Sequence, residues 1–184
     1  MGGSRPNVQA VSSVIKSNLS SLSSGVFQYD SALSQSTRAI LLDADACRPF
    51  AEARVLEQRI DEVTKANLKF YQAFESLDIA KMDEVWAHLE YVTCVHPGWT
   101  LRSDWPSVRD SWVLIFNNTF SMRFELTEVM VQVAGDMAWV ICVENITSQQ
   151  SDEPQQARVL ATNLFERIGD EWLMIHHHGS TVMG

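Results

Sequence analysis

Two stretches of the chain hold the side chains best suited to acid–base chemistry. The first, from Cys94 to Trp99, reads Cys-Val-His-Pro-Gly-Trp, and the second runs from Ala161 to His178. Histidine titrates near neutral pH, and chemical groups concentrate at strand ends and in loops. His96 stands before a Pro-Gly turn, so we interpret it as the first candidate base. The alternative is a histidine that only locks the turn by a hydrogen bond to the backbone.

The second stretch ends in three consecutive histidines, His176, His177 and His178. Side chains alternate between the two faces of a strand, so His176 and His178 share one face and His177 takes the other. With His96 they offer three nitrogen ligands to zinc, but no carboxylate or thiolate is placed to complete such a site. We therefore expect His176 and His178 to face a pocket, and we expect no metal.

The elements that position these residues begin with helices. Apolar residues recur at steps of three and four from Leu56 to Leu77, which predicts one long helix. Asp78 is a good N-cap for a second helix that reaches residue 89. Asp104 followed by Pro106 predicts the start of a third helix.

After residue 118 the apolar period changes to two, which predicts long strands, and a short strand precedes them at residues 91–95. Gly135-Asp136 and Gly169-Asp170 fit two-residue hairpin turns. The long strands are expected at residues 122–133, 137–147, 157–168 and 172–179. Three helices followed by an antiparallel sheet make an α+β fold.

The two turns predict which residues lie opposite each other. Asn163 is expected opposite His176 as a polar pair, which either orients a ligand or fixes the register. Glu144 is expected opposite Thr127. It either pairs with Thr127 or Arg158, or it acts as a carboxylate base whose pKa is raised by an apolar pocket.

Both faces of the predicted sheet are rich in apolar residues, and helices can cover only one of them. We therefore expect the outer face to be covered by a second copy in a symmetric homodimer. Trp99 is expected to cap the mouth of the pocket. Cys94 and Cys142 are expected in the core.

Composition limits the other classes of function. The chain has 184 residues, a hydrophobic fraction of 46% and a formal net charge of -9, which argues against nucleic-acid binding. No apolar run approaches the about 20 residues of a membrane helix. Three cysteines without close spacing indicate free thiols in a reducing compartment.

The beginning of the chain differs in composition from the rest. Residues 1–29 contain no Asp or Glu and many serines, whereas all six tryptophans lie after residue 85. We expect a Ser-rich extension over residues 1–50, disordered or partly helical, and a folded domain over residues 51–184. A cytoplasmic location is expected, and an organelle stroma or matrix reached through the Ser-rich segment is the alternative.

Residues 58–180 resemble the SnoaL-like family of the nuclear transport factor 2-like superfamily. The resemblance rests on the order of their motifs: Phe70 to Phe74, Val85-Trp86, Cys94 to Trp99, Val108 with Ser111-Trp112, Trp139 to Glu144, Ala161 to Asn163, and Trp172 to His178. It implies a cone-shaped barrel, with three helices packed on a curved antiparallel sheet around an open-ended apolar pocket, and frequent dimers. Family members tend to carry Gly before the third helix, where this chain has Arg102-Ser103-Asp104.

The expected function is therefore binding of a small, mainly apolar molecule, with cofactor-free isomerisation, cyclisation or dehydration as the enzymatic form. A dimerisation or assembly module within a larger complex is the alternative, because this fold serves many functions. His96 is the expected catalytic residue, and no cofactor is expected. The expected ligand-binding residues are Tyr91, Trp99, Trp112, Glu144, Asn163, His176 and His178.

Overall fold

The computed structural model describes residues 44–149 and 153–183 of the chain. Residues 48–184 form one compact unit. The predicted Ser-rich extension lies mostly outside the described residues, so its boundary at residue 50 stays a prediction. The elements in chain order are α3 (Ala44–Ser76), α4 (Ile79–Asp83), β1 (Thr93–Val95), β2 (Arg102–Ser103), α5 (Trp105–Asn117), β3 (Ser121–Ala134), β4 (Met137–Gln149), β5 (Gln155–Ile168) and β6 (Glu171–Thr181).

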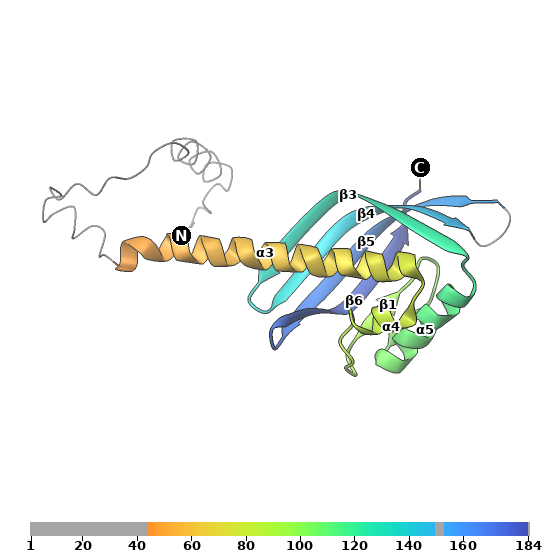
Figure 1. Ribbon diagram of the computed structural model, residues 1–184, viewed down its shortest axis with the longest axis horizontal. Helices are drawn as coiled ribbons and strands as arrows, with labels where there is room; N and C mark the ends of the chain where they lie inside the picture. The colour runs from red at the N-terminus through yellow and green to blue at the C-terminus, as the bar shows by residue number, and fades with distance from the viewer. Residues whose placement is uncertain (1–43, 150–152, 184) are drawn as a thin grey trace, which may run out of the picture. The chain divides into compact units, whose positions relative to one another are not determined.

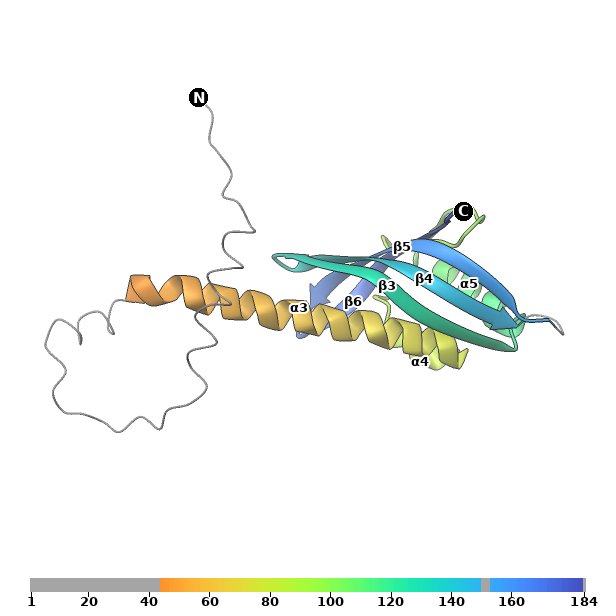
Figure 2. The same cartoon turned by 90° about the horizontal axis from the view of Figure 1, so that it is seen from above.

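The long helix α3 places one row of residues against the sheet (Figures 1 and 2). Val63, Asn67, Phe70 and Phe74 recur at helical spacing and are buried, as the apolar period predicts. One of the four, Asn67, is polar. A polar side chain in a buried row needs a hydrogen-bond partner, and the sheet supplies it.

The six strands form one curved sheet in the order β2-β1-β6-β5-β4-β3. The α+β class is confirmed, but the sheet is mixed rather than antiparallel, because β1 pairs with β6 in parallel. Thr93 lies beside His176 and Cys94 beside His177 in that pairing. The first candidate stretch of the sequence therefore lies directly against the triple histidine.

Both predicted hairpin turns are confirmed. Gly135 and Gly169 have φ of 63° and 64°, which a residue with a side chain rarely adopts. The register that follows from the second turn holds only over its first residues. Arg167 lies opposite Trp172, but the pairing shifts after Phe165.

The shift is a β-bulge in β6, where Ile175 has no partner on β5. One extra residue moves each later side chain to the opposite face. The predicted pair of Asn163 with His176 is therefore wrong, and Asn163 lies opposite His177. A second bulge follows Thr127 on β3, so Thr127 lies opposite Val143 rather than opposite Glu144.

The helix α4 is much shorter than predicted. Its start is confirmed, because Asp78 accepts a hydrogen bond from the amide of Ala80 at 2.9 Å. It ends at Asp83 because the following backbone pairs with β6: Met174 donates to the carbonyl of Val85 at 2.9 Å. Pairing with the sheet edge replaces the next helical turn.

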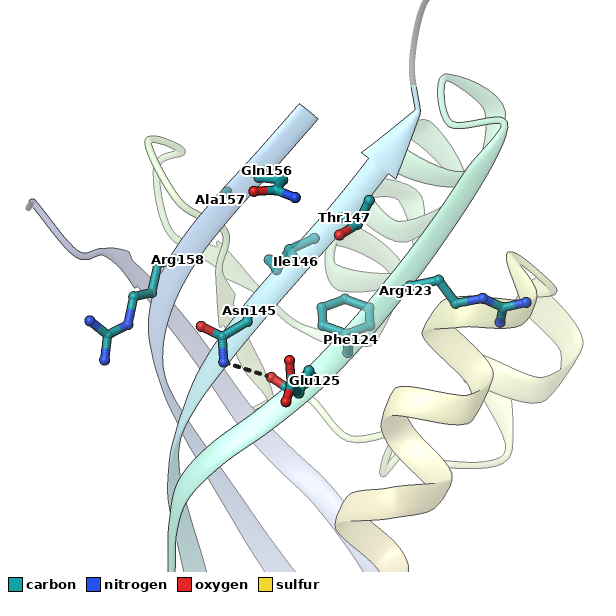
Figure 3. A pocket seen from close by; sticks show the side chains of 9 residues that line it. All are labelled: Arg123, Phe124, Glu125, Asn145, Ile146, Thr147, Gln156, Ala157 and Arg158. Atoms are coloured by element: carbon teal, nitrogen blue, oxygen red, sulfur yellow. Dashed lines mark hydrogen bonds between the residues drawn. The ribbon is translucent and has the colours of Figure 1, made fainter. Parts of the chain in front are cut away.

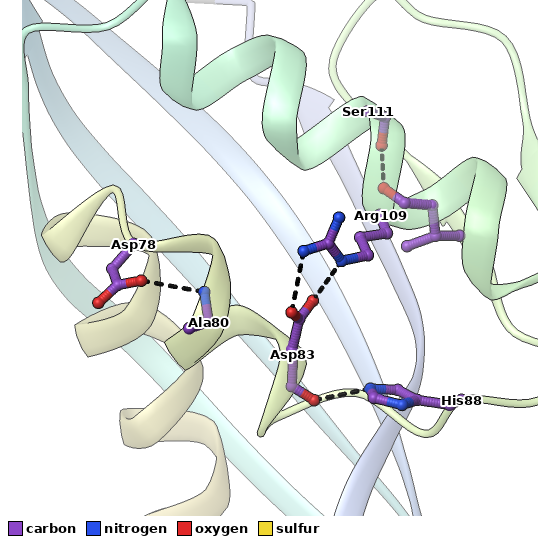
Figure 4. A network of polar contacts seen from close by, with 7 residues as sticks. Asp78, Ala80, Asp83, His88, Arg109 and Ser111 are labelled. Carbon is purple, nitrogen blue, oxygen red and sulfur yellow. Dashed lines mark hydrogen bonds and ion pairs between the residues drawn. The ribbon is translucent and has the colours of Figure 1, made fainter.

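A bidentate ion pair joins α4 to α5 (Figure 4). Arg109 donates to the two carboxylate oxygens of Asp83 at 2.7 and 3.0 Å. The backbone carbonyl of Asp83 also lies 2.8 Å from Nε2 of His88. The fork geometry of arginine holds these two short elements in a fixed orientation.

The helices cover one face of the sheet, which we call the inner face. The other face, the outer face, carries large apolar side chains that remain exposed among the described residues: Met130, Met137, Trp139, Leu160 and Ile168. No helix in the described part of the chain is long and apolar enough to cross a membrane.

Helix α5 begins at a residue with unusual backbone geometry. Asp104 is the N-cap, its carboxylate accepts from the amide of Ser107 at 2.8 Å, and its φ is 69° with ψ of 156°. That region of φ and ψ is adopted almost only by glycine. The chain therefore holds an aspartate in a strained backbone conformation at the start of α5.

Two substitutions at Asp104 distinguish the effect of backbone strain on stability from the effect of losing the N-cap hydrogen bond. Asp104→Gly and Asp104→Ala both remove the carboxylate, but only glycine relaxes the backbone. We expect the glycine variant to be more stable to urea unfolding than the alanine variant by about 1–3 kcal/mol. The same pair at Asp78, whose φ is -103°, is the control for the ordinary N-cap preference. An equal difference at both caps would contradict strain at Asp104.

Candidate functional site

Hydrogen bonds cross the inner face between α3 and the sheet. Tyr71 Oη donates to Oε1 of Glu144 at 2.7 Å, and Sγ of Cys142 lies 3.3 Å from the same hydroxyl. Nδ2 of Asn163 donates to Tyr71 Oη at 3.2 Å and to Oδ1 of Asn67 at 2.8 Å. One turn of α3 is thereby joined to β4 and β5. These residues and His177 form what we call the interior network.

His177 completes the interior network from β6. Its Nδ1 lies 2.7 Å from Oδ1 of Asn163. Both amide protons of Asn163 are already donated, so its oxygen accepts and His177 carries its proton on Nδ1. Nε2 of His177 is then a lone-pair acceptor. Burial lowers the pKa of His177 well below its usual value, which keeps the ring neutral.

A second pair, His96 and Ser111, lies beside the interior network. Nε2 of His96 is 2.8 Å from Oγ of Ser111, and this hydroxyl donates to the carbonyl of Val108 at 2.6 Å. Ser111 therefore accepts from His96, whose Nδ1 is left as an acceptor 3.8 Å from Sγ of Cys94. Burial, and then the positive charge of Arg102, lowers the pKa of His96 to about 4.

Glu144 is the group of this site that titrates near neutral pH. Burial raises its pKa to about 7, and the hydrogen bond from Tyr71 offsets part of that rise. Burial and the neighbouring carboxylate raise the pKa of the Tyr71 hydroxyl, which therefore stays protonated. A carboxyl group that exchanges its proton at pH 7 next to a permanent donor is suited to acid–base catalysis.

Aromatic rings fill the space around these groups. The ring centroids of Phe70 and Phe74 lie 5.7 and 4.8 Å from that of Trp112. Trp112, Phe70 and Asn163 are each 0% exposed, so no water-sized space adjoins them. Beside Glu144 three inward-facing side chains are only half-buried: Phe124, Leu126 and Ile146.

The triple histidine is placed differently from the prediction. His177 lies on the inner face, whereas His176 and His178 lie on the outer face, because of the bulge at Ile175. Nδ1 of His176 lies 2.7 Å from Oγ1 of Thr93. The expectation that His176 and His178 face the interior is therefore wrong.

The predicted partners of Glu144 are wrong as well. Thr127 accepts from Asn145 at 3.1 Å, and Arg158 pairs with Glu128 at 3.1 Å. Glu144 instead faces inward to α3, since strand alternation turns it away from both. Within the described part of the chain its carboxyl group therefore has no basic partner, and burial is the main cause of its raised pKa.

The predicted aromatic residues divide between two places. Trp112 lies against the interior network, and Trp99 is half-buried with its ring 5.1 Å from that of His96. Tyr91 is 54% exposed and donates to Glu166 at 2.5 Å. The structure thus gathers Trp99, Trp112, His96, Glu144 and Asn163, and it leaves Tyr91, His176 and His178 apart from them.

Sequence reasoning did not single out Asn67, Tyr71 or His177 as site residues. The spacing of Asn67 and Tyr71 is a usable signal, because residues four apart on a helix are neighbours. Two hydrogen-bonding side chains at that spacing within an aromatic run indicate a polar row that enters the core. No local signal marks His177, because its face depends on the bulge.

A separate cleft of about 540 Å³ lies at the ends of β3, β4 and β5 (Figure 3). Its outward-facing side chains form two polar rows: Arg123, Thr147 and Gln156, then Glu125, Asn145 and Arg158. Both arginines are paired with carboxylates, at 3.5 and 3.1 Å. Among residues 44–149 and 153–183, no group of three His, Cys, Asp or Glu side chains is placed to hold a metal ion.

Comparison with known proteins places the fold among described families. A family model described as SnoaL-like domain matches residues 63–184. A candidate dehydratase of the NTF2-like family from Streptomyces avermitilis is 37% identical, with a TM-score of 0.66, over 70% of this chain and 99% of that one. A candidate calcium/calmodulin-dependent protein kinase type II association domain from Thiobacillus denitrificans is 30% identical, with a TM-score of 0.58, over 64% and 93%.

A curated relative is longer than the matched region. The F-box protein SKIP8 of Arabidopsis thaliana is 29% identical over 121 residues, which are 66% of this chain and 50% of that protein. The chain therefore spans about half the length of this relative.

The raised pKa of Glu144 makes stability depend on pH in a defined direction. The folded chain holds a proton on Glu144 that the unfolded chain releases, so this group lowers stability as pH rises from 4.5 to about 7. Glu144→Gln keeps the side-chain size and the acceptor for Tyr71 but does not titrate. We expect its unfolding free energy, relative to wild type, to increase across this window by on the order of 2–3 kcal/mol.

Urea unfolding at a series of pH values measures this difference. Glu128→Gln, at a carboxylate that is 68% exposed, is the matched control and should stay parallel to wild type. The lowered pKa of His96 has the opposite effect, because it makes the unfolding free energy rise with pH between about 4 and 6.5. This contribution is the same in wild type and variant, so it cancels in the difference between their unfolding free energies. If the difference in unfolding free energy between Glu144→Gln and wild type were the same at every pH in this window, Glu144 would be ionised in the folded chain.

Proposed function

Because the chain belongs to the SnoaL-like domain family, we propose that its cone binds a small, mainly apolar organic molecule and offers it acid–base groups. The observation that carries this proposal is Glu144, a buried carboxyl group with a pKa of about 7 that is bonded to Tyr71. A buried polar group without structural ion-pair partners is a candidate functional group. The 37% identity to the candidate dehydratase supports an enzymatic form.

In this proposal Glu144 exchanges a proton with the ligand, while the single hydroxyl proton of Tyr71 stays hydrogen-bonded to Glu144 and orients its carboxyl group. Glu144 suits both directions of transfer, because its two protonation states are similarly populated at pH 7. Isomerisation, cyclisation and dehydration need only such transfers and no cofactor. His96 is neutral at that pH and shares its Nε2 proton with Ser111, so we assign it a positioning role beside Trp112.

Entry to the site would occur beside Glu144. Leu126 on β3 lies directly opposite Glu144 on β4. Ile146 lies on β4 as well, two residues after Glu144. These side chains and Phe124 are half-buried, whereas Trp112 at the other end is fully buried. A ligand that displaces the half-buried trio reaches the carboxyl group without disrupting the aromatic cluster.

Native mass spectrometry of the purified protein tests this proposal. We expect a wild-type chain with one bound small molecule, and about a tenfold lower bound fraction for Glu144→Gln, since a direct hydrogen bond to a charged partner is lost. Glu128→Gln should bind as wild type does. Equal bound fractions in wild type and Glu144→Gln, or no bound mass in the wild type, would exclude Glu144 as a ligand contact.

A second candidate function is assembly, which the outer face favours. Met130, Trp139 and Leu160 are 57%, 37% and 46% exposed on adjacent strands. We propose that this face pairs with the same face of a second copy, since a closed two-fold dimer buries one patch against itself. The similarity to the candidate association domain supports this arrangement.

Light scattering at micromolar concentration tests the dimer. We expect wild type to give the mass of two chains and Leu160→Glu to give that of one, because a charge in an apolar interface is costly to bury. Leu68→Glu, at a residue of α3 that is 48% exposed, is the matched control and should stay dimeric. A wild-type mass of one chain would contradict the proposal.

A further inference from the structure

A cleft of about 440 Å³ lies beside the first turns of α5 and does not include the interior network. Arg102 on β2 and Asp110 on α5 line it, together with the N-cap Asp104. A volume of this size is typical of small-molecule sites. The cleft therefore brings both signs of charge to one small space.

Among the residues that the structure describes, no carboxylate pairs with the charge of Arg102. Among the described residues its side chain makes no ion pair and no hydrogen bond, and its Nε is buried without an acceptor. The guanidinium group lies 5.5 Å from the ring centroid of Trp99, which fixes its position. The buried Nε is closed to the cleft, so a ligand there can meet only the rest of the guanidinium group, whose charge and planar shape a carboxylate matches.

The two carboxylates of the cleft do not supply that acceptor. Asp104 is occupied with the amide of Ser107, at 2.8 Å, and Asp110 forms no ion pair among the described residues. Both side chains are exposed and more than 4.0 Å from the nitrogens of Arg102 in the described structure. The cleft thus keeps opposite charges apart, although a direct pair would satisfy both.

Of the four other lining residues, Ser107 and Ser111 are polar, and Pro106 and Leu114 are apolar. Leu114 is 51% exposed one turn beyond Asp110, and Pro106 is exposed at the start of the helix. An apolar side chain placed on them would remove this surface from water. The cleft therefore offers a ligand one positively charged group, two carboxylates and an apolar surface.

We propose that this cleft binds a free α-amino acid with an apolar side chain. Its carboxylate pairs with Arg102, its ammonium group with Asp110 and Asp104, and its side chain lies on Leu114. A zwitterion satisfies both charges at once, whereas a simple anion would meet the repulsion of two aspartates. This site is independent of the acid–base role proposed for Glu144.

Isothermal titration calorimetry with three probes tests the proposal. L-leucine has both charges, 4-methylpentanoate lacks the ammonium group, and 3-methylbutylamine lacks the carboxylate, while all three keep the same apolar end. We expect leucine to bind wild type about tenfold or more tightly than either analogue, since each lost ion pair is worth a factor of about ten.

Arg102→Gln and Asp110→Asn should each weaken leucine binding by about tenfold. Arg54→Gln changes an exposed arginine of α3 and should bind leucine as wild type does. Thermal unfolding of each variant shows whether it is folded. Because Asp110 is exposed, Asp110→Asn still tests the proposal if Arg102→Gln does not fold. Absence of leucine binding, equal binding of 4-methylpentanoate, or unchanged binding by Arg102→Gln would each overturn the proposal.

Discussion

The hydrogen bond between His177 and Asn163 is the contact on which the interior of this domain depends. Asn163 is 0% exposed and uses its carbonyl oxygen and both amide protons within the protein. A buried amide without partners would cost several times the net gain of one hydrogen bond. A register that moved His177 to the outer face would break its bond to the Asn163 oxygen, so this contact joins β6 to β5, and the amide group of Asn163 joins both to α3.

The same contact explains why the bulge at Ile175 matters. Without the extra residue, His176 would follow Met174 onto the inner face, and His177 would be on the outer face. With it, the neutral ring of His177 lies between Asn163 and the aromatic cluster. The outer face then keeps His176, bonded to Thr93 on the neighbouring strand. One inserted residue thus decides which histidine belongs to which face.

The two faces of the sheet carry different kinds of side chains. The inner face carries a carboxyl group whose proton is exchangeable at neutral pH, enclosed by aromatic rings. The outer face carries exposed apolar side chains and no covering helix among the described residues. The acid–base role and the assembly role that we propose therefore use different residues.

The sequence by itself determined most of the elements and their order, although not the end of α4 or the short strand β2. The helical spacing from Leu56 to Leu77, the cap at Asp78 and the glycines at 135 and 169 are local signals, and the structure follows them because turns and helix ends depend on a few adjacent residues. Only the tertiary structure decided the registers. The bulges on β3 and β6 exchanged the faces of His176 and His177 and separated Glu144 from Thr127. The reason is physical: a bulge changes the pairing of strands and the contacts of buried groups such as Asn163 with distant elements, and no local pattern of residues records those contacts.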